Sequence, residues 1–109
     1  MSDQLATAGA PRASRLDPGL YLVATPIGAA RDITLRALDI LASADVIAAE
    51  DTRTARKLME IHGLAVAGRP LIAYHDHNGK AQRPRLLKMV QDGKSVAYAS
   101  DAGTPLVAD

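Results

Sequence analysis

Four short apolar runs recur along the chain, and each is continuous instead of alternating with polar residues. They cover residues 20–24, 46–49, 71–74 and 95–99. Strands of a parallel sheet are buried on both faces, so they lack the alternation that a half-exposed strand shows. The runs therefore predict parallel strands covered on both sides, a pattern typical of folds in which helices flank a sheet.

The segments between these runs have helical periodicity. Residues 32–44 carry their polar side chains on one narrow stripe, and residues 52–62 separate an apolar face from a charged one. Gly63 follows the second segment as a C′ residue. A third, shorter helix has Pro84 in its first turn and ends at Gly93. The resulting β-α-β-α-β-α-β order predicts a three-layer α/β domain with a parallel sheet and right-handed crossovers.

The two ends of the chain differ from this regular middle. Residues 1–19 mix small, polar and charged residues without periodicity, which predicts a flexible N-terminal extension. The α/β domain then occupies residues 20–109. No segment after the last run returns to cover the final strand, so we expect a chain truncated before a second domain.

Composition excludes several classes of protein. The 109 residues include no cysteine, which rules out disulfides, a thiolate nucleophile and Cys-ligated zinc. No apolar run is long enough to span a bilayer and no secretory signal is present, so we expect a soluble, cytoplasmic protein. The net charge of +1 is lower than that of domains that hold nucleic acid by charge alone. Three tyrosines without Phe or Trp predict an aliphatic core and few stacking platforms for RNA.

Polar and small residues gather in the loops that follow the four apolar runs. In a parallel sheet these loops open on one edge, where helix N-termini and free backbone N–H groups bind ligands. The loops on the opposite edge are less polar in character. The four loops are Thr25-Pro26-Ile27-Gly28, Glu50-Asp51-Thr52-Arg53, His75-Asp76-His77-Asn78 and Ser100-Asp101-Ala102-Gly103-Thr104-Pro105.

Two of these loops also have purely structural interpretations. Thr25–Gly28 can be an ordinary turn, with Asp32 capping the next helix. In Glu50–Arg53, Asp51 or Thr52 can serve as an N-cap, which explains those two residues better than it explains Glu50.

The other two loops favour ligand binding without metal. His75 and His77 are too few ligands for a metal, so we expect no metal site and assign them to hydrogen bonding with a polar substrate. The small residues of the 100–105 loop allow close backbone approach to a cofactor that carries a ribose or an amino-acid moiety.

Two nucleotide motifs are absent. Gly93-Lys94-Ser95 is similar to the end of a P-loop, but position 88 is Lys and the segment precedes a strand. No G-x-G-x-x-G follows the first strand. Kinases, NTPases and dinucleotide-dependent dehydrogenases are therefore disfavoured.

The loop sequences resemble those of a known family. Five blocks, in order, are similar to the N-terminal domain of the ribosomal RNA small subunit methyltransferase I group, within the tetrapyrrole methylase superfamily. Four of the five coincide with the loops named above. The blocks are residues 22–28, 32–38, 49–53, 74–78 and 100–106.

The resemblance implies S-adenosylmethionine as the methyl donor and 2′-O-methylation of a cytidine ribose in small-subunit ribosomal RNA. It also implies two α/β domains with the cofactor in the cleft between them, and a homodimer. This chain supplies the first domain only, so we expect the isolated fragment to be inactive.

The resemblance also assigns residues by position. The cofactor-side residues are Thr25, Pro26, Gly28, Ser100, Asp101, Ala102, Gly103 and Thr104. The substrate-facing residues are Glu50, Asp51, Thr52, Arg53, His75, His77 and Asn78. The proton of the ribose hydroxyl needs a base, and the chemically able candidates are Glu50, Asp51, His75 and His77. The sequence does not choose among them, so the catalytic residue stays unassigned.

The chain departs from the family pattern in two places. It has Ala29-Ala30 where family members usually have Asn and a larger apolar residue, so the resemblance does not assign a side-chain contact beside the cofactor at these two positions. It has Gly79 where many members have Glu, at a helix start where we expect little effect.

Two alternative functions remain from the sequence. One is a methylase that acts on a tetrapyrrole with the same fold. The other is a non-catalytic dimerisation or ligand-binding module, because fold alone does not decide function.

Overall fold

The computed structural model describes residues 15–26, 32–66, 68–75 and 77–101. Strands and helices alternate along the chain as the sequence predicts. The elements are β1 (Gly19–Thr25), α2 (Leu35–Ser43), β2 (Val46–Ala49), α3 (Thr52–Ile61), β3 (Leu71–Ala73), α4 (Gly79–Gln91) and β4 (Ser95–Asp101).

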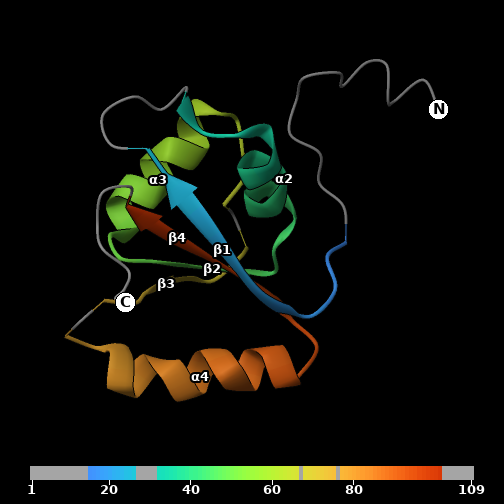
Figure 1. The fold of residues 1–109 in the computed structure, drawn as a ribbon, viewed down its shortest axis with the longest axis vertical. Coiled ribbons are helices and arrows are strands. Elements are labelled where there is room, and N and C mark those ends of the chain that lie inside the picture. The colour runs from blue at the N-terminus through green and yellow to red at the C-terminus, as the bar shows by residue number, and fades with distance from the viewer. Residues whose placement is uncertain (1–14, 27–31, 67, 76, 102–109) are drawn as a thin grey trace.

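The described strands form one parallel sheet with the order β1-β4-β2-β3 (Figure 1). The last strand in sequence, β4, therefore lies inside the sheet between the first two. In register, Tyr98 of β4 lies beside Leu22 of β1 on one side and Ala48 of β2 on the other. The predicted parallel sheet is confirmed, whereas the strand order was not predicted from the sequence.

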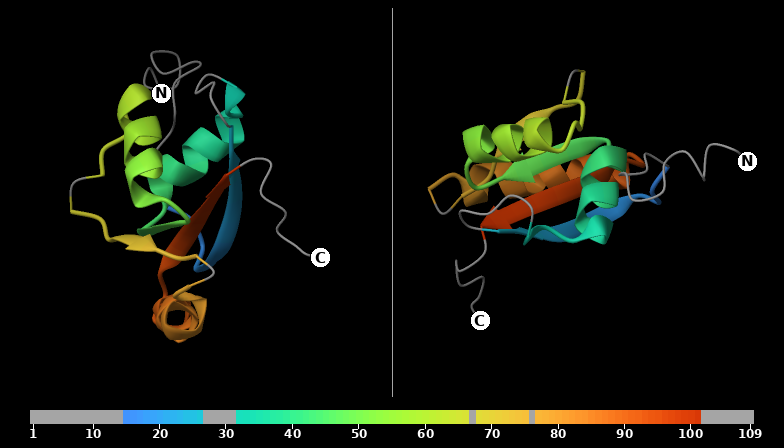
Figure 2. Two further views of the ribbon diagram at one scale, coloured as in Figure 1. Left: turned by 90° about the vertical axis from the view of Figure 1, so that its left-hand side faces the viewer. Right: turned by 90° about the horizontal axis from the view of Figure 1, so that it is seen from above.

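Helices cover both faces of the sheet, as the prediction of three layers requires. On one face α2 and α3 pack over β1, β2 and β4 through a cluster that includes Leu41, Ile47 and Met59, each at most 1% exposed. On the other face α4 is the one described helix (Figure 2). Its Leu86 packs in a cluster with Val96 and Ile72. The fully buried side chains of the described core are aliphatic apart from Met59 and Ser95, and none is aromatic, so the predicted aliphatic core is confirmed.

The prediction that β1 is buried on both faces is wrong. Along β1 burial alternates: Val23 and Thr25 are buried, while Leu20 and Leu22 are 56% and 65% exposed. The physical reason is position, because β1 is an edge strand of the described sheet and α4 lies over the other strands.

Two predicted details of the helices are also wrong. Thr34, not Asp32, caps α2, and its hydroxyl accepts a hydrogen bond from the Ala37 N–H at 3.0 Å. Pro84 lies inside α4 instead of in its first turn, because the helix already begins at Gly79. The sequence pattern located this helix but placed its start too late, since Gly79 and Lys80 carry no apolar signal.

The predicted glycine stops are confirmed. Gly63 and Gly93 have φ of 72° and 93°, where a side chain is disfavoured. The N–H of Gly63 donates to the Glu60 carbonyl and that of Leu64 to the Met59 carbonyl, which is the Schellman arrangement. The two stops fix where α3 and α4 turn back towards the sheet.

The segment before β1 contacts the domain. Leu16 packs against the core, and the Tyr21 hydroxyl donates to the Asp17 carbonyl at 2.8 Å. Gly19 already belongs to β1. Residues 1–14 lie outside the described range, so the predicted extension stays a prediction. Among the helices described here, none has the length and apolar character needed to cross a membrane.

Candidate functional site

The strand order sorts the predicted site residues into two neighbouring groups at the carboxyl edge of the sheet. Thr25 at the end of β1 lies in register with Asp101 at the end of β4, so the two predicted cofactor loops leave adjacent strands. Ala49 lies in register with Ala73, so the two predicted substrate loops also leave adjacent strands. Because β4 lies between β1 and β2, the two groups adjoin across the sheet.

A buried hydrogen bond ties the first group together. The Thr25 hydroxyl donates to the Ser100 carbonyl at 2.9 Å, and both side chains are nearly inaccessible, at 5% and 6% exposure. The hydroxyl of Thr25 therefore adds a side-chain hydrogen bond to the backbone pairing of the two strand ends. Half-buried Pro26 follows it directly. Gly28, Ala102, Gly103 and Thr104, like Ala29 and Ala30, lie outside the described residues, so their assignments stay predictions.

Asp51 is the N-cap of α3, as one of the two sequence interpretations proposed. Its carboxylate accepts hydrogen bonds from the N–H groups of Arg53 and Thr54, at 3.0 and 3.3 Å. The bond from Thr54 is the main reason why the pKa of Asp51 lies below its ordinary value. Thr52 is the first helical residue and not the cap, and Arg53 is exposed beside Asp51. Glu50, half-buried just before the cap, is not explained by capping.

Asn78 shapes the loop after β3. Its side-chain oxygen accepts from the His75 N–H at 2.8 Å, and its side-chain nitrogen donates to the Ala73 carbonyl at 2.8 Å. Both polar ends of the amide thus bind the backbone of its own loop. His77 is exposed, and its N–H donates to Nδ1 of His75 at 3.2 Å. In this geometry the neutral His75 ring carries its proton on Nε2.

A polar hollow of about 280 Å³ opens beside the second group. Two of the predicted residues, Glu50 and His75, line it. Sequence reasoning did not assign the other lining residues to the site. These are Tyr74, Gly79, Lys80, Arg83 and Tyr98.

The missed residues lie in the loop after β3, on α4 and on β4. Tyr74 and Tyr98 form an edge-to-face pair with ring centroids 5.4 Å apart, and Nε of Arg83 donates to the Tyr74 hydroxyl at 3.3 Å. Lys80 and Arg83 are three residues apart near the start of α4, a spacing that places two cations on one helix face. That spacing was the sequence signal from which these two cations could have been assigned to the site. Tyr98 had none, because it lies within an apolar run.

Gly79 lies in the wall of this hollow, so the departure from the family pattern falls inside the site and not merely at a helix start. A Cβ on Gly79 would stand 3.6 Å from the Tyr74 ring and 3.7 Å from the Arg83 guanidinium. These are ordinary contact distances, so the glycine is not sterically required there.

The hollow has the groups to bind a polar, anionic ligand. Its lining carries two cations and one carboxylate, although the whole chain is nearly neutral. Cations bind phosphate, tyrosine rings bind planar bases, and a half-buried carboxylate can accept a proton. In the described part of the chain, no group of three or more His, Asp or Glu side chains is arranged to hold a metal ion.

Comparison with known proteins gives the family. Residues 19–109 match the family model described as Tetrapyrrole (Corrin/Porphyrin) Methylases. Three similar proteins carry the name "Ribosomal RNA small subunit methyltransferase I". The chain is 55% identical over 94 residues to the one from Mesorhizobium japonicum, 48% over 90 residues to that of Escherichia coli O157:H7, and 44% over 90 residues to that of Bacillus subtilis.

These matches cover most of this chain but a small part of its relatives. They span 86% of the chain in the first comparison and 83% in the other two. The same matches span only 31%, 30% and 30% of the relatives. The chain thus corresponds to about a third of each relative's length.

Proposed function

Because this chain belongs to the tetrapyrrole (corrin/porphyrin) methylase family, we propose that it forms the N-terminal part of an enzyme that methylates small-subunit ribosomal RNA with S-adenosylmethionine. The finer proposal is that the methyl group goes to the 2′-oxygen of a cytidine ribose. The observation that carries the proposal is the meeting of both predicted loop groups at one edge of the sheet, in a chain 44–55% identical to relatives named for this activity.

The relatives favour ribosomal RNA over a tetrapyrrole as the substrate. The three relatives compared share a name that refers to ribosomal RNA, and each matches 83% or more of this chain. The cations beside Tyr74 and Tyr98 suit a nucleotide with its phosphate.

The cofactor belongs beside β1 and β4 in this proposal. The Thr25 hydroxyl donates to the Ser100 carbonyl and both residues are buried, so backbone groups at these positions are the contacts we expect. Pro26, Gly28, Asp101, Ala102, Gly103 and Thr104 complete the proposed cofactor set. When bound, S-adenosylmethionine supplies a methyl group on a sulfonium, which is already a good electrophile.

The protein must then orient the ribose hydroxyl and accept its proton. Glu50 is the base we propose, because its half-buried carboxylate lines the hollow, whereas Asp51 and exposed His77 do not. His75 also lines it, but its Nδ1 accepts the His77 N–H. His75 can donate from Nε2 to the substrate. Lys80 and Arg83 hold phosphate in this proposal. Exposed Arg53 and His77 and half-buried Thr52 extend the RNA contact, while Asn78 keeps the loop in shape.

The resemblance implies a cofactor cleft between two domains, and this chain corresponds to about a third of each relative's length. We therefore propose that the isolated 109 residues are inactive and that the active species is the whole protein, a homodimer in the cytoplasm. A non-catalytic ligand-binding module is the competing possibility, and the test below separates the two.

The test uses the product of the complete reading frame with labelled S-adenosylmethionine and unmodified small ribosomal subunits. We expect label on a single cytidine, at the ribose 2′-oxygen. Label at another position on the RNA would support the RNA methyltransferase activity but reject the cytidine 2′-oxygen as its target. Cofactor binding without RNA label would point to a small-molecule substrate. The absence of both cofactor binding and RNA label would favour the non-catalytic module.

A further inference from the structure

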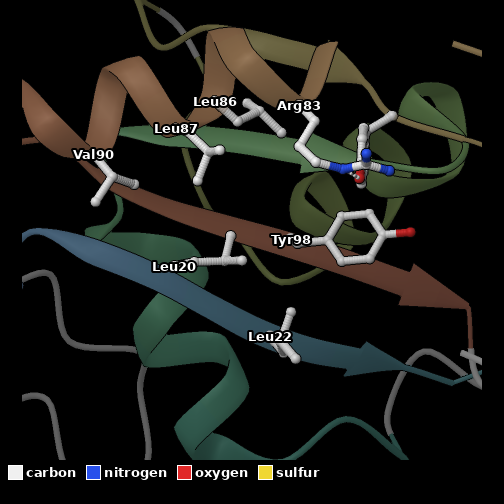
Figure 3. A pocket seen from close by; sticks show the side chains of 8 residues that line it. Leu20, Leu22, Arg83, Leu86, Leu87, Val90 and Tyr98 are labelled. Atoms are coloured by element: carbon white, nitrogen blue, oxygen red, sulfur yellow. Dashed lines mark hydrogen bonds between the residues drawn. The ribbon is translucent and has the colours of Figure 1, made fainter. Parts of the chain in front are cut away.

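Arg83 lies at the boundary between the polar hollow and an apolar groove. Arg83, Tyr74 and Tyr98 line both spaces. Figure 3 shows the Arg83 side chain extending from α4 on the side of the sheet to which Tyr98 also points. The other side chains that line the groove are aliphatic and accept no hydrogen bond; they belong to Leu20, Leu22, Leu86, Leu87 and Val90. Among the described residues, a polar ligand of the guanidinium therefore finds further polar groups only on the side of the hollow.

One hydrogen bond holds the Arg83 guanidinium. Its Nε donates to the Tyr74 hydroxyl at 3.3 Å, and the two residues are nine positions apart, on α4 and in the loop after β3. The ion pairs found among the described residues use other cations, Arg53 and Lys88. Within this part of the chain, Arg83 is therefore oriented by a neutral group, and no carboxylate pairs with its charge.

Tyr74 is a well-fixed acceptor for this bond. Its N–H donates to the Ala49 carbonyl at 2.9 Å, and its ring packs edge-to-face on Tyr98 against the core cluster beneath α4. Both the backbone and the ring of Tyr74 are thus held on the sheet. A long exposed arginine loses much rotamer freedom when it binds a ligand, and a bond already made to a fixed partner lowers that cost.

Gly79 leaves room for this contact. Arg83 lies four residues after Gly79 on α4, and a helical side chain leans towards the N-terminus of its helix, so Arg83 covers the surface over Gly79. A Cβ on Gly79 would stand 3.7 Å from Nη2 of Arg83 and 3.6 Å from the Tyr74 ring. A methyl group fits at these distances, but a longer side chain would compete with the guanidinium for the space beside Tyr74.

The bond from Nε determines which donors of Arg83 remain for a ligand. A guanidinium has five N–H groups, and the four on Nη1 and Nη2 are left when Nε–H is engaged. Two parallel N–H groups of these terminal nitrogens match two oxygens of one phosphate group. The pairing through Nη1 and Nη2 together is therefore the bidentate mode still open to Arg83. The ammonium of Lys80, which also lines the hollow, has no such planar geometry.

We propose that Tyr74 is a positioning residue, whose hydroxyl orients Arg83 so that Nη1 and Nη2 bind one phosphate group of the RNA substrate in the hollow. This inference rests on the proposed function, in which the hollow receives RNA. It gives the two cations different roles: Arg83 recognises the geometry of a phosphate group, whereas Lys80 contributes charge.

Steady-state methylation by the complete protein, with unmodified small ribosomal subunits, tests the role of the hydroxyl. Tyr74→Phe removes the hydroxyl and keeps the ring beside Tyr98. We expect it to raise KM for the subunit about 3–10-fold and to leave kcat nearly unchanged, because the contact acts on substrate binding. Tyr21→Phe is the matched control and should keep the parent KM, since it removes a hydroxyl that binds the Asp17 carbonyl, on a ring packed against the core on the α2 side.

A double-mutant cycle separates positioning from a merely structural role. In an Arg83→Ala background we expect Tyr74→Phe to change KM little, whereas in a Lys80→Ala background it should keep its full effect. Arg83→Lys should not restore the parent KM, because an ammonium cannot form the bidentate pair. If Tyr74→Phe acts equally with and without Arg83, or if Arg83→Lys binds the subunit as the parent does, the proposal is wrong.

The Nε–H signal of Arg83 in ¹⁵N NMR of the complete protein tests the contact without using activity. The signal is assigned by its loss in Arg83→Lys. We expect this proton to exchange with water more slowly in the parent than in Tyr74→Phe, and equal exchange in the two would overturn the proposal.

The two kinds of measurement distinguish the failure of this inference from the failure of the proposed function. A complete protein that does not methylate the subunits rejects the proposed function and, with it, RNA phosphate as the ligand of Arg83. Slow exchange of the Nε–H in that protein would still identify Tyr74 as the group that orients Arg83. A protein that methylates the subunits but shows additive effects in the cycle rejects this inference alone.

Discussion

Asp45 and Ser95 bind each other reciprocally where β2 and β4 begin. The Asp45 N–H donates to the Ser95 hydroxyl oxygen at 3.0 Å, and the Ser95 N–H and hydroxyl donate to one carboxylate oxygen of Asp45, at 2.9 and 3.2 Å. Ser95 is fully buried. The pair lies at the edge of the sheet opposite the candidate site, and it aligns two strands that are far apart in sequence.

The carboxyl group of Asp45 should make the stability of the fold depend on pH in the acidic range. The backbone hydrogen bond from Ser95 is the main cause that lowers the pKa of Asp45. A carboxyl with a lowered pKa in the folded state stabilises the protein above its unfolded pKa of about 4, and loses this contribution as pH falls through the folded value. We expect Asp45→Asn to flatten the loss of Tm below about pH 4. Ser95→Ala is the control, because it keeps the backbone bond and should retain most of the acid slope. An unchanged slope in Asp45→Asn would contradict this.

Arg69 joins the end of α2 to the loop before β3. Its guanidinium donates to the Leu41 and Ala44 carbonyls at 2.7 and 2.9 Å, and also to the Ala65 carbonyl. We expect Arg69→Ala to lower the free energy of unfolding by about 2 kcal/mol, measured in urea, because buried carbonyls lose their donors. Arg69→Lys should not restore it, since one ammonium cannot replace the planar fork. Full rescue by Lys would show that charge alone matters.

The same substitution should have opposite effects at two glycines. Gly79 lies in α4 with room for a methyl group, so Gly79→Ala should stabilise the fold by roughly 0.5–1 kcal/mol. Gly63 has φ of 72°, so Gly63→Ala should destabilise it by about 1 kcal/mol. Thermal unfolding of both variants checks the pair. A loss of stability in Gly79→Ala would mean that the wall of the hollow is tighter than the structure shows.

Glu50 is the residue on which the proposed proton transfer depends. In the complete protein, we expect Glu50→Gln to lower kcat for RNA methylation by about 10²–10⁴-fold while cofactor affinity is kept. Glu60→Gln, on the exposed face of α3, is the matched control and should stay near the parent rate. A Glu50→Gln enzyme with normal kcat would return the role of base to the other candidates.

Lys80 and Arg83 should act on binding and not on chemistry. The double variant Lys80→Ala, Arg83→Ala is expected to raise KM for the ribosomal subunit, to reduce the salt dependence of binding, and to leave kcat nearly unchanged. Arg56→Ala, a cation on the exposed face of α3, controls for loss of charge. If the double variant and Arg56→Ala raise KM equally, the cations contribute by general charge and not by a phosphate contact in the hollow.

Much of the local structure could be predicted from the sequence. The alternation of strands and helices, the stop at Gly63 and the cap at Asp51 all depend on residues within a few positions of each other. The parallel sheet followed from the continuous apolar runs. The gathering of Glu50 and His75 at one edge followed from the rule that parallel strands end on the same side.

Only the tertiary structure determined the features that depend on the strand order and on α4 covering the second face of the sheet. Because β4 lies between β1 and β2, Tyr98 packs against Tyr74 and lines the same hollow as Lys80 and Arg83. The apolar run that contains Tyr98 gives no local signal of these neighbours. The exposure of Leu22 has the same origin, since a leucine in a strand is buried only if another element lies over it. Local patterns in this protein determine which elements form, whereas contacts between residues far apart in sequence determine which side chains those elements bring together and which they leave uncovered.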